Sequence, residues 1–116
     1  MSGRDTGMDL DISESDGVLL VKVQDEDCGR LWEVLKPRIR GGVKAVVLDF
    51  SDVGYLNSTN IARVITLRNK LMDNDVGLLL GNVRDNIRSV FRILKLERLF
   101  NLELSTEHAL AAARTR

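Results

Sequence analysis

The chain has 116 residues, of which 44% are hydrophobic and 29% are charged, a composition typical of one globular domain. Its 17 basic and 17 acidic residues cancel, so no net charge attracts the protein to nucleic acid or to an anionic membrane. The aromatic residues, three Phe, one Tyr and one Trp, are too few for a surface that stacks on bases. We therefore expect no nucleic-acid binding.

The N-terminal residues and the apolar runs bear on where the protein is located. Residues 1–7 are small and polar and are predicted to be disordered, which leaves a single domain over residues 8–116. The N-terminus lacks the apolar core of a signal peptide, and no apolar run approaches the roughly 18 residues of a membrane span. We expect a cytoplasmic protein without membrane insertion.

The first half of the domain is predicted to begin with a hairpin. Apolar and acidic residues alternate over Met8–Ile12, the period of a half-buried strand. The segment 14–17 follows as a turn, with its Asp-Gly pair a strong hairpin signal, and Val18–Val23 is the second strand. In Gly29–Arg40 the apolar residues have a spacing closer to that of a helix, and Pro37 is expected to break or bend its last turn.

The second half alternates between strands and helices. Val43–Phe50 is an almost continuous apolar run, typical of a central strand covered on both faces, and Val76–Gly81 is a second such strand. Between them an apolar stripe predicts a helix that ends before Asn74. The last elements are a helix with a core-facing stripe of Ile87, Val90, Phe91 and Leu94, an edge strand at Leu102–Leu104 and an Ala-rich helix at Thr106–Arg114.

This order predicts an α/β fold. We expect a mixed sheet of four to five strands with an N-terminal antiparallel hairpin, and about four helices packed mainly on one face.

Cys28 and His108 are the only residues of their kinds in the sequence. No acidic segment has the spacing of a calcium-binding loop, so we expect no metal and no cofactor. We interpret Cys28 as a structural residue, because no His lies near it in sequence to activate its thiol.

The turn after the first central strand carries the chemistry of most interest. It places Asn57, Ser58 and Thr59 at the start of an amphipathic helix, where free backbone N–H groups and the helix dipole favour an anion. A hydroxyl at this position is a natural place to add or remove a phosphate. Ser, Thr and Asn are also ordinary helix caps, so the residues by themselves leave both interpretations of Ser58 open.

Two other phosphate chemistries fit the sequence less well. Asp49 and Asp52 at a strand end suggest a response-regulator receiver, but a receiver has a helix between its first two strands, where this chain has a tight turn. We interpret Asp49 as a structural carboxylate of the turn. Gly77 and Gly81 lack the spacing and the Lys of a phosphate-binding loop.

The ordered set of segments resembles the STAS domain, the family of bacterial anti-sigma factor antagonists and of sulphate-transporter tails. Val46–Phe50 is similar to the family's apolar strand with its Asp, and Leu56–Ala62 occupies the place of a hydrophobic residue followed by the motif Asp-Ser-Ser-Gly-Leu-Gly. The resemblance extends from Met8 to Ala113. Three later segments also look like parts of the family pattern: Leu79–Val83, Val90–Phe100 and Ser105–Leu110.

The resemblance implies a role for each residue of the motif. Ser58 takes the position of the serine that a partner kinase phosphorylates, and Thr59 takes the second hydroxyl position. In the family this kinase also sequesters a sigma factor, and the unmodified antagonist binds the kinase and frees the sigma factor. Asn57 stands in place of the family's Asp and can still cap the helix. Asn60 and Ala62 stand in place of its two glycines.

The resemblance therefore implies a regulatory protein-binding domain without catalysis of its own: an anti-sigma factor antagonist in bacterial signal transduction and transcription regulation, switched off by phosphorylation of Ser58. The implied partners are a kinase/anti-sigma factor and a PP2C-type phosphatase, and the sequence fixes no oligomeric state. The expected contact residues are Gly54, Tyr55, Asn57, Ser58, Thr59, Asn60, Ile61, Arg63 and Asn82.

Two alternatives stay open. One is a non-switching STAS scaffold, or a soluble subunit of a larger assembly or transport system, which needs no phosphate. The other is a STAS module that binds a small ligand or a nucleotide.

Overall fold

The Asp16-Gly17 pair forms the turn of the N-terminal hairpin in the computed structural model, which describes residues 10–103 and 105–115. Both residues have positive φ, 55° and 78°, as a two-residue hairpin turn requires. They join β1 (Asp11–Ser15) to β2 (Val18–Gln24) in antiparallel pairing. The turn is shorter than predicted, because Glu14 and Ser15 still pair with β2. The N-terminal end of the strand predicted at Met8–Ile12 lies outside the described residues.

The remaining strands extend the sheet in one direction. They are β3 (Ala45–Asp52), β4 (Gly77–Gly81) and β5 (Asn101–Glu103), and the order across the sheet is β1-β2-β3-β4-β5. From β2 onward each neighbouring pair is parallel. The mixed sheet with an opening hairpin confirms the predicted fold class. Leu104, the last residue of the predicted edge strand, lies outside the described residues.

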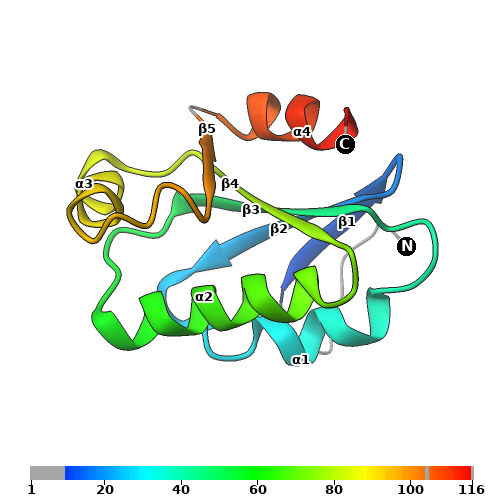
Figure 1. Cartoon of the computed structure of the whole chain (residues 1–116), viewed down its shortest axis with the longest axis horizontal. Coiled ribbons are helices and arrows are strands. Elements are labelled where there is room, and N and C mark those ends of the chain that lie inside the picture. The colour runs from blue at the N-terminus through cyan, green and yellow to red at the C-terminus, as the bar shows by residue number, and fades with distance from the viewer. Residues whose placement is uncertain (1–9, 104, 116) are drawn as a thin grey trace.

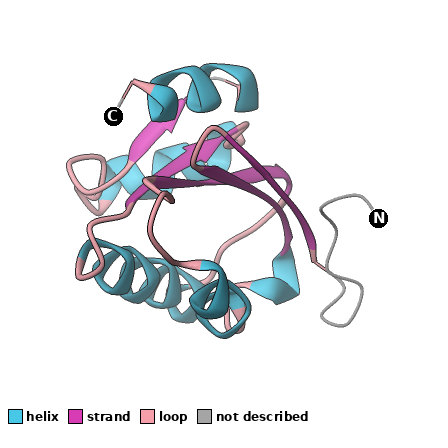
Figure 2. Cartoon of the chain, turned by 90° about the vertical axis from the view of Figure 1, so that its right-hand side faces the viewer, coloured by secondary structure: helices cyan, strands magenta, loops and turns pink. Residues whose placement is uncertain are grey.

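The helices are arranged as this strand order demands. Crossovers between parallel strands are right-handed, so a sheet that grows steadily in one direction places its connecting helices on the same side. In Figures 1 and 2, α1 and α2 lie beneath the sheet, and α4 lies on the opposite face. The helices have these bounds: α1, Leu31–Leu35; α2, Ser58–Met72; α3, Asp85–Ile93; α4, Thr106–Arg114.

The core has two parts because β3 is covered on both faces. Val46, Leu48 and Phe50 belong to the larger cluster, which the buried stripe of α2 and the buried residues of α3 complete. Ala45 and Val47 point the other way, as the two-residue period of a strand requires, and belong to the smaller cluster under α4. This double burial explains why the strand reads as an unbroken apolar run.

The segment predicted as a helix over Gly29–Arg40 is only partly helical. Only α1 is α-helical there, and Lys36–Arg38 continues as a 3₁₀ turn, because Pro37 has no N–H to donate. A further 3₁₀ turn, Asp25–Asp27, precedes α1. Its buried Asp27 carboxylate accepts hydrogen bonds from the Gln24 backbone N–H at 2.9 Å and from Arg30 Nη2 at 2.8 Å.

Candidate functional site

The loop between β3 and α2 is anchored at both ends and exposed in the middle. Val53 and Leu56 are buried, whereas the intervening Gly54 is exposed and the side chain of Tyr55 is 65% exposed. Leu56 and Ile61 occupy the two positions of a hydrophobic staple, and both belong to the same core cluster. The staple fixes the direction in which the chain enters α2.

The residue that caps α2 is Asn57. Its side-chain Oδ1 accepts a hydrogen bond from the Asn60 backbone N–H at 2.8 Å, and its backbone carbonyl accepts one from the Ile61 N–H at 3.0 Å. Ser58 is the first helical residue, it is exposed, and its hydroxyl makes no hydrogen bond within the described part of the chain. Thr59 is exposed beside it. Asn57 thus caps α2, and modification of the Ser58 hydroxyl would break no hydrogen bond that stabilises the helix.

The predicted contact residues divide into two groups. Ile61 is only 6% exposed and packs in the core, because it begins the apolar stripe of α2. Asn82 is partly buried and uses its amide within the fold. The others form the exposed start of α2 and the loop before it, with Asn60 partly buried: Gly54, Tyr55, Asn57, Ser58, Thr59, Asn60 and Arg63.

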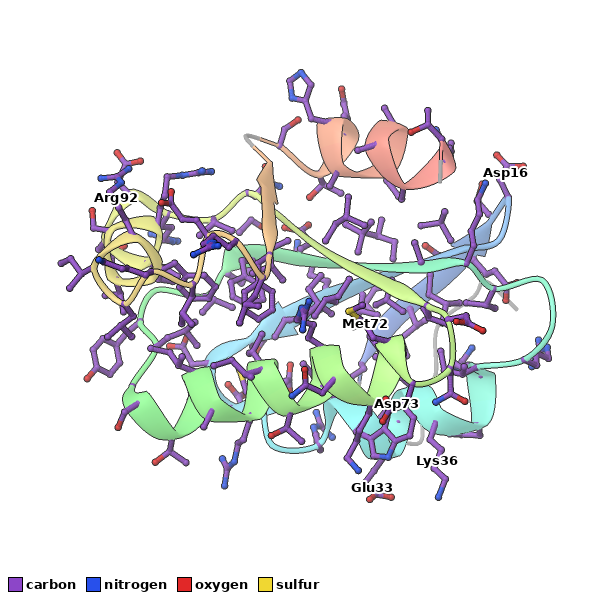
Figure 3. The ribbon with its side chains drawn as sticks, viewed as in Figure 1. Asp16, Glu33, Lys36, Met72, Asp73 and Arg92 are labelled. Atoms are coloured by element: carbon purple, nitrogen blue, oxygen red, sulfur yellow. The ribbon has the colours of Figure 1, made fainter. Side chains whose placement is uncertain are left out.

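A groove of about 610 Å³ extends from Ser58 along α2 on the side of α1. Two cations lie in it: Arg63, which donates to Asn60 Oδ1 at 3.3 Å, and Lys70, whose Nζ lies 5.6 Å from the centroid of the Trp32 ring. Figure 3 shows Glu33 on the outer side of α1, pointing away from the sheet. The full lining is Cys28, Gly29, Trp32, Glu33, Ser58, Thr59, Ala62, Arg63, Thr66, Leu67 and Lys70.

This groove was not predicted from the sequence. The helical spacing of Thr59, Arg63, Thr66 and Lys70 indicates a polar face of α2, but local periodicity cannot show that a second helix lies beside that face.

Cys28 in this groove is a structural residue, as predicted. The pKa of its thiol is raised to about 11, chiefly by burial and then by the nearby carboxylates of Asp27 and Asp25, whereas the Arg63 guanidinium lowers it by less. The thiol therefore stays protonated at neutral pH and is a poor nucleophile.

Asp49 ties the ends of two strands to the start of α4. Its Oδ1 accepts hydrogen bonds from the Ser51 backbone N–H at 2.9 Å and from Asn82 Nδ2 at 3.2 Å. Asn82 also donates to Thr106 Oγ1 at 2.8 Å and accepts from the Thr106 N–H at 3.2 Å. Burial opposes ionisation of Asp49, but the hydrogen bonds from Ser51, Asn82 and Thr106 outweigh it and hold the pKa of the carboxyl below its usual value. This confirms Asp49 as a structural carboxylate, and the opening hairpin excludes the receiver fold.

Gly81 lets β4 and α4 approach closely at this network. A Cβ at residue 81 would lie 2.9 Å from Thr106 Cα, a backbone atom that can move only with the helix. We expect Gly81→Ala to lower the free energy of unfolding by about 1–3 kcal/mol. A Cβ at Gly54 would meet nothing within 4 Å, so Gly54→Ala should change it by less than about 0.5 kcal/mol. Urea unfolding of both variants measures the two changes. Equal free energies of unfolding for Gly81→Ala and Gly54→Ala would contradict the close approach described at Gly81.

The described residues contain no cluster of three or more His, Cys, Asp or Glu side chains able to hold a metal ion. Among the same residues, no helix combines the length and the hydropathy that a membrane span needs.

Comparison with known proteins places this geometry in a family. The family model for the STAS domain matches residues 10–109. The structure is similar to an anti-sigma factor antagonist from Mycobacterium paratuberculosis, with a TM-score of 0.74 and 24% identity over 90% of this chain and 92% of that one. It is also similar to a sulfate transporter family protein from Wolinella succinogenes, with a TM-score of 0.77 and 19% identity over 99% and 97%. For the phosphorylated form of the Bacillus cell fate determinant SpoIIAA the TM-score is 0.67 and the identity 15%, over 92% and 99%. At these identities the likeness to each solved structure shows the fold.

Proposed function

The chain belongs to the STAS domain family, and we propose that it is an anti-sigma factor antagonist whose binding to a kinase/anti-sigma factor is switched off by phosphorylation of Ser58. One observation carries the proposal: Ser58 presents an exposed hydroxyl at the first position of α2, while its neighbour Asn57 caps the helix. The similarity to SpoIIAA, an anti-sigma factor antagonist whose phosphorylated form has been solved, supports it. The domain itself performs no catalysis in this scheme.

A phosphate on Ser58 would be favourable for the free protein. The first turn of a helix leaves N–H groups without intrahelical partners, and the helix dipole favours negative charge at that end. The same phosphate would be unfavourable in the complex, because it adds about −1.5 to −2 charges where the partner surface fits a neutral hydroxyl. A PP2C-type phosphatase would restore the binding form.

The contact surface in this proposal is the exposed loop together with the first turns of α2. Tyr55, 65% exposed, offers the kind of aromatic side chain that contributes most to protein interfaces. The groove beside α2 begins at Ser58 and Thr59, so the same partner would extend along it toward Trp32.

Phosphorylation with the cognate kinase and ATP tests the assignment directly. We expect mass spectrometry to show one added phosphate on the wild-type chain and none on Ser58→Ala. Thr59→Ala, which removes the neighbouring hydroxyl, should still accept one phosphate. Unchanged labelling of Ser58→Ala would remove Ser58 from the proposal, and loss of labelling in Thr59→Ala alone would transfer the role to Thr59.

A second candidate function is a non-switching STAS scaffold in a transport system. The similarity to a sulfate transporter family protein, which covers 99% of this chain, favours it. A scaffold of this kind would bind its partner whether or not residue 58 carries a charge.

A further inference from the structure

Gly54, at the exposed middle of the loop before α2, is held through both of its backbone polar groups. Its N–H donates to Asp25 Oδ1 at 3.0 Å, and its carbonyl accepts from Asn86 Nδ2 at 2.9 Å. Asp25 begins the 3₁₀ turn after β2, and Asn86 lies in the first turn of α3. Two side chains therefore hold one residue of the loop, one from an element that precedes it in the sequence and one from an element that follows it.

The position of Gly54 is restrained by these two hydrogen bonds and not by side-chain packing. Nothing lies within 4 Å of the place where its Cβ would be, and glycine has the widest backbone freedom of any residue. The buried neighbours Val53 and Leu56 anchor the ends of the loop, and Arg84 Nη2 donates to the Ser51 carbonyl at 3.0 Å farther upstream. Within the described residues, the side-chain hydrogen bonds that reach the exposed segment 54–55 come from Asp25 and Asn86.

We propose that Asp25 and Asn86 are positioning residues, which hold Gly54 and thereby fix the turn that presents Tyr55 and Ser58 to the partner. A loop already held in one conformation loses less freedom on binding, so its affinity is higher than that of a mobile loop with the same contacts. The effect on the kinase rests on the proposed function; the effect on the loop does not.

The substitutions that test this role spare the rest of the fold. Asp25→Ala removes the acceptor, and Asp25→Asn retains an oxygen that can accept the Gly54 N–H. Glu26→Ala is the matched control, since it removes the same charge from the next exposed residue of the same 3₁₀ turn. Asn86→Asp removes the donor to the Gly54 carbonyl, while an acidic residue in the first turn of α3 is favoured by the helix dipole.

The first measurement needs no partner. We expect NMR hydrogen exchange at the Gly54 amide to become faster by about tenfold in Asp25→Ala, and to return to the wild-type rate in Asp25→Asn. In Asn86→Asp the residues 53–57 should show increased backbone mobility, with thermal unfolding unchanged. Wild-type exchange in Asp25→Ala, or an equal acceleration in Glu26→Ala, would overturn the proposal.

The second measurement is the steady-state kinetics of the kinase with each variant as substrate. We expect KM for Asp25→Ala and Asn86→Asp to rise about three- to tenfold with little change in kcat, because the bound geometry is the same once formed. An unchanged KM in variants whose loop has become mobile would overturn the positioning role. If the kinase modifies no chain, including wild type, the proposed function fails, and the exchange data still decide whether Gly54 is held.

Discussion

Ser58→Asp is expected to weaken binding to the kinase/anti-sigma factor by about 30-fold or more. An unpaired charge enclosed at a protein interface costs about 2–5 kcal/mol, and the lower limit of this range already corresponds to roughly 30-fold in Kd. The loss cannot come from unfolding, since a carboxylate at the first position of α2 stabilises a helix by about 0.3–1 kcal/mol. Isothermal titration calorimetry with the purified partner measures the effect.

The matched control for this experiment is Ser58→Asn, which has the shape of the Asp variant without its charge. Its affinity should remain close to that of Ser58→Ala, so the difference between the Asp and Asn variants isolates the charge. Equal affinities for these two would contradict the switch and favour the scaffold, whose binding is indifferent to charge at this position.

Phe91→Ala is expected to lower the free energy of unfolding by about 3–5 kcal/mol, the cost of removing a buried aromatic side chain and leaving a cavity. The Phe91 side chain is fully buried, and its ring lies 5.4 Å from that of Phe100, the residue just before β5, at an interplanar angle of 55°. This pair joins α3 to the edge of the sheet. Since small domains are stable by about 5–15 kcal/mol, the loss is a large share of the total. Urea unfolding measures it.

Ile93→Ala, two residues along the same helix, is the control for Phe91→Ala. The Ile93 side chain is 76% exposed, so its truncation should change the free energy of unfolding by less than about 0.5 kcal/mol. If Phe91→Ala costs no more than Ile93→Ala, the ring does not hold α3 in the way described.

The elements that the sequence predicts well are those whose signals are local. α4 runs over Thr106–Arg114 as predicted, because Ser105 caps it by accepting the His108 N–H at 3.1 Å, and apolar residues mark its buried face. α2 likewise begins at the predicted polar turn. The break expected at Pro37 is present as the 3₁₀ turn Lys36–Arg38, but α1 covers only Leu31–Leu35 of the helix predicted over Gly29–Arg40. The 3₁₀ turn Asp25–Asp27 before it was not predicted.

At the site, too, the features that depend on nearby residues could be predicted from the sequence, and those that depend on contacts between distant residues could not. The exposure of Ser58 follows from the apolar stripe of α2, and the burial of Ile61 could have been predicted from that stripe, since Ile61 begins it. The bonds of Gly54 to Asp25 and Asn86 span 29 and 32 residues of chain. No periodicity or motif encodes such pairings, because they arise only when the strand ends come together in the sheet.

The cap on α2 has a consequence for how a signal at the next residue would behave over time. Because Asn57 caps the helix, the side chain of residue 58 is not needed to stabilise it. A group could therefore be attached there and removed again without a change in the backbone conformation. The two forms would share one scaffold and differ in surface charge alone. Such a protein could go through many cycles of modification and reversal. The rate of each cycle would be set by the enzymes that act on the protein, because no refolding step is needed.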